Sequence, residues 1–121
     1  MSRIHLAIAA AAVAAILVAV APAGASQTAL PKLVATDGPG FTITLKKAGK
    51  KVTRLKSGRY SITVKDLSSA HNFHLTGPGV RKTTTVSFQG TKTWIVKFRK
   101  GTYKFVCDPH APIMHGSFKV S

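Results

Sequence analysis

The chain has 121 residues, which is enough for one small domain. Eighteen lysines and arginines stand against three acidic residues, so the formal net charge is +15 at pH 7. With so few acids, and with no phosphate-binding loop or Ser/His/Asp arrangement, we expect no carboxylate pair and no enzymatic activity. The charge favours encounters with anionic partners, although dispersed lysines are also typical of a generally basic surface without a specific partner.

Residues 1–25 have the pattern of a secretory signal peptide. Arg3 supplies a positive start, residues 4–21 are apolar and rich in alanine, and Ala23-Gly24-Ala25 fits a small-x-small cleavage site before Ser26. The alternative is an uncleaved membrane anchor, which the weak membrane affinity of alanine disfavours. We therefore expect an exported protein (periplasmic, cell-surface or extracellular) with no membrane span after cleavage.

After a flexible lead over residues 26–32, we expect one domain over residues 33–121. Short segments with turn signals between them alternate apolar and polar residues, as strands do. These segments are 41–45, 60–64, 71–75, 84–88, 94–98, 103–107 and 118–120. No segment has a helical period, and short connections favour antiparallel pairing. The sequence thus predicts an all-β, antiparallel Greek-key sandwich of seven or eight strands.

Cys107 is the only cysteine of the chain. An exported protein that keeps one unpaired thiol needs a reason, and metal ligation is the best one available. Because side chains alternate along a strand, Cys107 points the same way as Tyr103 and Phe105, into the core.

Three further candidate ligands accompany this thiol. His110 follows Cys107 by three residues and Met114 follows it by seven, while His71 stands upstream. Two imidazoles and a thiolate in a trigonal plane, with a weak axial thioether, form the ligand set of copper electron-transfer sites. Zinc also takes Cys and His, but a thioether argues against it. The alternative is a buried structural Cys, a core Met and a polar loop His.

The upstream His71-Asn72, the Cys-Asp-Pro-His motif at 107–110 and Met114 together resemble the plastocyanin, amicyanin and pseudoazurin branch of the cupredoxins, which are small exported blue copper proteins. The resemblance extends over nearly all of residues 33–121. It implies His71 and His110 as imidazole ligands, Cys107 as thiolate and Met114 as axial ligand of one copper ion. Asn72 matches the position whose side chain ties the histidine segment to the cysteine loop, which would orient that loop.

The loop between the last two strands, expected over residues 108–115, departs from the family pattern in length. Met114 lies four residues after His110, between the spacings of the shorter and longer family loops, so the axial distance and the potential stay open. His115 is an alternative ligand, although on a strand it would point away from Met114. His74, three residues from His71, is expected on the opposite strand face as a surface or loop-contacting histidine.

The function that we expect is a soluble, monomeric one-electron carrier cycling between Cu(I) and Cu(II). An apolar rim at 111–113 would dock a redox partner with an acidic surface, and we expect no specific nucleic-acid partner. The alternative is an exported copper-binding or copper-delivery protein, although only Cys107 and Met114 remain as sulfur ligands after cleavage. A copper oxidase or reductase needs a second histidine cluster, and the histidines outside the signal segment are largely used by one site.

Overall fold

The computed structural model describes residues 10–19 and 29–121. Residues 10–19 are exposed and without regular secondary structure, and the predicted cleavage site before Ser26 lies outside the described residues. No helix within those two described stretches is long and apolar enough to cross a membrane.

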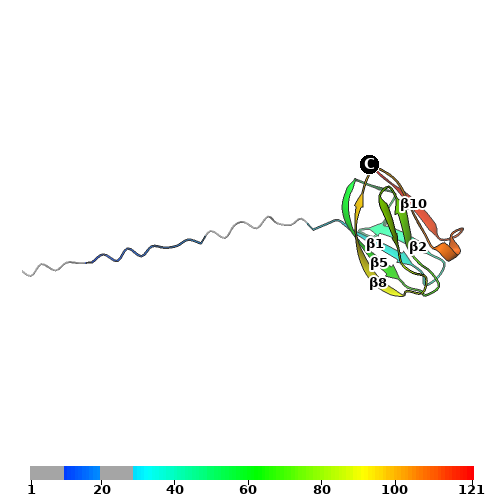
Figure 1. Cartoon of the computed structure of the whole chain (residues 1–121), viewed down its shortest axis with the longest axis horizontal. Helices are drawn as coiled ribbons and strands as arrows, with labels where there is room; N and C mark the ends of the chain where they lie inside the picture. The colour runs from blue at the N-terminus through cyan, green and yellow to red at the C-terminus, as the bar shows by residue number, and fades with distance from the viewer. Residues whose placement is uncertain (1–9, 20–28) are drawn as a thin grey trace, which may run out of the picture.

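Residues 32–121 form two five-stranded sheets that pack face to face (Figure 1). The first sheet has the order β3 (Lys50–Lys51), β2 (Ile43–Lys47), β1 (Lys32–Asp37), β5 (Gly58–Asp66) and β8 (Gly90–Phe98). The second has the order β4 (Arg54–Leu55), β10 (His115–Val120), β9 (Gly101–Val106), β6 (His74–Gly77) and β7 (Val80–Thr83). The all-β sandwich is confirmed. Its ten strands include two of only two residues, where seven or eight strands were expected, and β1 begins one residue before the predicted domain boundary.

Two strand pairs are parallel. β1 pairs with β5 and β10 pairs with β4 in this direction, while the other six of the eight pairs are antiparallel as expected. Parallel neighbours need a long connection, and here β2, β3 and β4 themselves provide the connection between β1 and β5.

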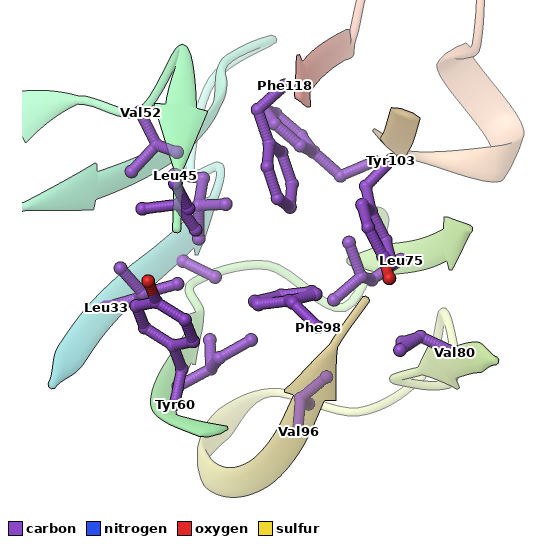
Figure 2. Close-up of a cluster of buried hydrophobic side chains, with 14 of the residues drawn as sticks. Leu33, Leu45, Val52, Tyr60, Leu75, Val80, Val96, Phe98, Tyr103 and Phe118 are labelled. Atoms are coloured by element: carbon purple, nitrogen blue, oxygen red, sulfur yellow. The ribbon is translucent and has the colours of Figure 1, made fainter. Parts of the chain in front are cut away.

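The core lies between the sheets and follows the predicted alternation. Tyr60, Ile62 and Val64 on β5 are all buried, and their side chains point toward the second sheet. Phe98 on β8 packs against Tyr60 of its own sheet, and also against Tyr103 and Phe118 of the other sheet, as Figure 2 shows. Cluster members from both sheets are thus joined through aromatic contacts, which contribute beyond their buried area.

The strand expected over 41–45 begins only at Ile43. Gly38 N–H donates to the Thr42 carbonyl at 2.9 Å and closes a turn, so ladder pairing starts with Ile43 opposite Asp37. Phe41 is therefore part of the turn and is 63% exposed.

The prediction of a strand over residues 84–88 is wrong, because the structure has no strand there. Thr84 turns inward and bonds to a loop: its N–H donates to the Phe73 carbonyl at 3.1 Å and its Oγ1 accepts the Phe73 N–H at 2.9 Å. Phe88 N–H then donates to the Thr85 carbonyl at 3.1 Å, which forms a turn before β8. Local hydrogen bonds thus outweigh the alternating pattern in this segment.

Candidate metal centre

Three of the predicted ligands lie on one tightly bonded loop between β9 and β10. The loop covers residues 107–114, one residue earlier than expected, and contains the short 3-10 helix η1 (Asp108–His110). His110 N–H donates to the Cys107 carbonyl at 3.0 Å, Met114 N–H donates to the His110 carbonyl at 2.8 Å, and Cys107 N–H donates to the Met114 carbonyl at 3.0 Å. These bonds bring Cys107, His110 and Met114 together and fix their spacing.

His71 reaches the same place from a different part of the chain. The strand expected over 71–75 begins only at His74, so His71 lies in the loop before β6. Its N–H donates to the Ser68 carbonyl at 3.3 Å. Gly38, at φ +70°, packs against it so closely that a Cβ there would lie 3.1 Å from His71 Cδ2. The imidazole is thereby held between two turns.

The donor atoms of His71, Cys107 and His110 form a small triangle. The two Nδ1 atoms are 3.0 Å apart, and Cys107 Sγ lies 3.7 Å from His71 Nδ1 and 3.6 Å from His110 Nδ1. The point equidistant from all three lies about 2.0 Å from each, which is the circumradius of that triangle. Metal–nitrogen and metal–sulfur bonds in protein zinc sites are about 2.0–2.3 Å long, so the triangle fits an ion of the first transition row.

Burial separates Met114 from the alternative ligand His115. Met114 is fully buried beside Cys107 in the loop, whereas His115 is exposed on β10. The pleat of the strand turns His115 outward, as the sequence predicted. Cys107 is also fully buried and is a free thiol.

Asn72 connects the His71 segment to the loop. It is 2% exposed, its Nδ2 donates to Asp108 Oδ2 at 2.7 Å, and its Oδ1 accepts the Asp108 N–H at 2.7 Å. His74, the predicted loop-contacting histidine, lies 3.0 Å through Nδ1 from Asp108 Oδ1. Partial burial acts to raise the pKa of Asp108, but the hydrogen bonds from Asn72 and His74 lower it overall.

An apolar patch surrounds His110, which is half-buried. Phe41 packs edge-on against the rings of His71 and His110, with centroids 5.6 and 5.0 Å away. Ile113 is 64% exposed, and Ala111 and Pro112 are exposed beside it. The sequence predicted the rim at 111–113 but missed Phe41. Its position directly after a Gly-Pro-Gly turn was the available signal that it lies at a sheet end.

The fold and this site define a class of protein, and comparison with known proteins agrees with it. Residues 34–121 match the family described as copper binding proteins, plastocyanin/azurin family. The chain belongs to this family, which confirms the predicted cupredoxin membership and sets His71, Cys107, His110 and Met114 in the positions of type 1 copper ligands.

Solved structures share the fold at low sequence identity. Rusticyanin from Thiobacillus ferrooxidans aligns with a TM-score of 0.52 and 24% identity over 74% of this chain and 76% of its own. Reduced rusticyanin aligns with a TM-score of 0.54 and 22% identity over 74% of this chain and 78% of its own. A chain of a heme-copper terminal oxidase dimer aligns with a TM-score of 0.53 and 17% identity over 74% of this chain and 63% of its own. No curated protein sequence matches this chain significantly.

Proposed function

We propose that this protein carries single electrons on one copper ion held by His71, Cys107, His110 and Met114. The observation that carries the proposal is the triangle of two Nδ1 atoms and the Cys107 Sγ atom around a point about 2.0 Å from each. A bound copper ion would supply reversible one-electron chemistry, since thiolate and thioether suit Cu(I) and imidazole suits Cu(II).

The chain itself holds this ligand set in one arrangement. Two hydrogen bonds of Asn72 fix the loop to the His71 segment, and the three backbone bonds within the loop fix its own shape. Ligands held by such outer contacts keep their orientation when the charge at the site changes. A site that does not rearrange suits electron transfer better than it suits release of the metal.

His110 is the exit that we propose for the electron, because it is the least buried of the three triangle residues. The patch of Phe41, Ala111, Pro112 and Ile113 around it would form the small, brief interface of a redox encounter. A groove of about 650 Å³ next to the loop is lined by Lys51, Lys104 and His115 and by none of the described acids. Its charge favours an acidic partner.

The remaining parts of the proposal concern the whole protein. We propose export, with residues 1–25 removed and residues 33–121 acting as a monomeric, non-enzymatic domain. The alternative function is copper binding or delivery, for which a buried site tied down by Asn72 is a disadvantage.

The test uses the absorption of the Cu(II)-loaded protein. A short bond from copper to Cys107 Sγ in a trigonal site should give an intense band in the red, and Cys107→Ser should abolish it. Stopped-flow mixing with an acidic, reduced electron donor should then bleach the band, and ferricyanide alone should restore it. Recovery that requires added copper would show that the metal has left, and the carrier function would be rejected in favour of delivery.

A further inference from the structure

Two of the three acidic residues meet inside the protein. Asp37 ends β1 and Asp66 ends β5, and they are register partners across this parallel pair. Their exposures are 0% and 1%. The sequence predicted no carboxylate pair, and this was wrong because parallel pairing joins residues that are far apart in the chain.

The pair lacks the hydrogen-bond donors and cations that two carboxylates need. Asp66 Oδ1 accepts the Ser68 N–H at 3.2 Å, but no described residue donates to Asp66 Oδ2 or to either oxygen of Asp37. The only ion pair between described residues is that of His74 and Asp108. Buried charges without partners are strongly unfavourable.

The strands that flank the pair supply no charge. Ile43 on β2 lies opposite Asp37, and Gly90 on β8 lies opposite Asp66. Lys65 on β5 and Lys92 on β8 are exposed and form no ion pair with either acid among the residues described. The loop of residues 67–73 follows Asp66 and is bonded to both acids through Leu67 and Ser68, and its titratable group is His71.

One proton held between the two carboxyls removes this difficulty. It cancels one negative charge and supplies the missing donor, since a hydrogen bond between carboxyls requires that one of them is protonated. Burial, followed by the hydrogen bond that this proton forms between Asp37 and Asp66 and by the negative charge of Asp66, raises the pKa of Asp37 to about 7.

The residues that contact His71 are also bonded to the two acids. Ser68 accepts the His71 N–H through its carbonyl and donates its own N–H to Asp66. Gly38, which follows Asp37, packs against the His71 ring. The Leu67 N–H also donates to the Asp37 carbonyl at 3.0 Å. Asp37 is therefore covalently bonded to a residue that contacts His71, and Asp66 is hydrogen-bonded to another.

We propose that Asp37 and Asp66 form a buried binding site for one proton, and that its occupancy is linked to the oxidation state of the metal centre. The linkage rests on the electron-carrier function proposed above. An electron that arrives from the donor protein adds one negative charge near the pair, and the pair then takes one proton from solvent if it has none. Oxidation returns the electron to the acceptor and the proton to solvent. Charge and protons balance at each step.

The proton site can be tested in the full-length metal-free protein. The chain has only three acidic side chains, all aspartates, so ¹³C NMR of aspartate-labelled protein should show three side-chain carboxyl signals. The Asp37 signal should titrate near pH 7, and the Asp108 signal should titrate below the ordinary aspartate range. Asp37→Asn should remove the titration near pH 7, because an amide supplies the donor without a titrating proton. Three signals that all titrate at ordinary aspartate pH would overturn the proposal, and Asp66→Asn provides the second variant if Asp37→Asn does not fold.

The linkage is tested by voltammetry of the copper-loaded protein across pH. The midpoint potential of the wild type should fall as pH rises through 7, because an ionised pair stabilises Cu(II), whereas the potential of Asp37→Asn should change less. Lys65→Gln is the matched control, since it alters a surface charge next to Asp66 and should follow the wild type. Parallel curves for wild type and Asp37→Asn would overturn the linkage. Absence of the red absorption band would reject the carrier function and the linkage with it, while the NMR titration would still decide the proton site.

Discussion

Asn72 and Asp108 are separated by 36 positions in sequence and exchange two hydrogen bonds of 2.7 Å. These bonds join the loop before β6 to the loop of residues 107–114 between β9 and β10. The amide uses both of its ends, so its orientation is fixed. This contact sets the distance between His71 and Cys107, which are the immediate neighbours of the two bonded residues.

Replacing Asn72 by alanine should loosen the site. The change removes both bonds and leaves the Asp108 N–H and the Thr84 carbonyl without this partner, which we expect to reduce the free energy of unfolding by about 1–3 kcal/mol. Urea denaturation measures this effect, and the absorption band should broaden in the copper-loaded variant. Thr83→Val is the control, because it removes the 3.2 Å contact to the same amide and the 2.7 Å bond from the Thr83 hydroxyl to the Thr84 carbonyl, but leaves both bonds between Asn72 and Asp108. Equal losses in both variants would contradict a special role for Asn72.

Met114→Gln should keep copper but lower the reduction potential. Met114 is fully buried and its carbonyl accepts the Cys107 N–H, and as a weak axial ligand its thioether can be replaced without loss of the three stronger donors. An amide oxygen is a harder donor that favours Cu(II), so voltammetry should show a shift to lower potential. An unchanged potential would indicate that another group, such as His115 or a backbone oxygen, occupies the axial position.

Asp37→Asn should make the protein more stable at neutral and alkaline pH. In the wild type, the folded state holds a proton on Asp37 between pH 3.8 and about 7, while the unfolded chain has lost it. The folded state therefore binds more protons in this range, and stability falls as pH rises through it. The full shift corresponds to a loss of about 4 kcal/mol above the folded-state pKa. Denaturation at pH 5 and pH 8 should show the gain of Asp37→Asn mainly at pH 8, and an equal gain at both would refute this explanation.

Gly77→Ala should destabilise the fold without altering the ligands. A Cβ at position 77 would overlap the ring of Tyr103, which is fully buried. The ring cannot move freely, because Tyr103 Oη accepts the Arg99 N–H at 2.9 Å and donates to the Pro78 carbonyl at 2.9 Å. Overpacking of this kind costs about 1–3 kcal/mol, measurable as a lower melting temperature. Gly49→Asn is a control in open space at positive φ, and it should have the smaller effect.

Electron exchange with an acidic partner should slow as salt is added. The formal charge of +15 includes seventeen lysines and arginines outside Arg3, and the Debye length falls to about 10 Å at 0.1 M ionic strength. Stopped-flow rates at 10 and 300 mM salt should therefore fall with an acidic partner and stay nearly constant with a neutral one. Lys104→Gln tests whether the groove contributes, with Lys97→Gln as the control on β8 of the other sheet.

The sequence predicted those features that depend on local alternation or on chemical type. The buried face of Tyr60, Ile62 and Val64 follows from a period of two, and the pairing of Cys107 with His110 follows from the ligand chemistry of copper. Features that depend on contacts distant in sequence were missed. The parallel pairing of β1 with β5, and the carboxyl pair that it creates, arise from a crossover through three other strands. The inward turn of Thr84 depends on Phe73, which no pattern within residues 84–88 reveals.

The donor triangle draws on two segments that lie 36 residues apart and belong to different connections of the sandwich. Neither segment alone can offer more than part of the ligand set, so the complete site exists only in the folded protein. Copper would then bind the folded state in preference to the unfolded chain and would stabilise the fold by mass action. The red absorption band of the copper-loaded protein would therefore measure whether the tertiary structure is intact. A packing defect far from the metal, such as one at Tyr103, should bleach the protein at the same denaturant concentration at which its strands are lost.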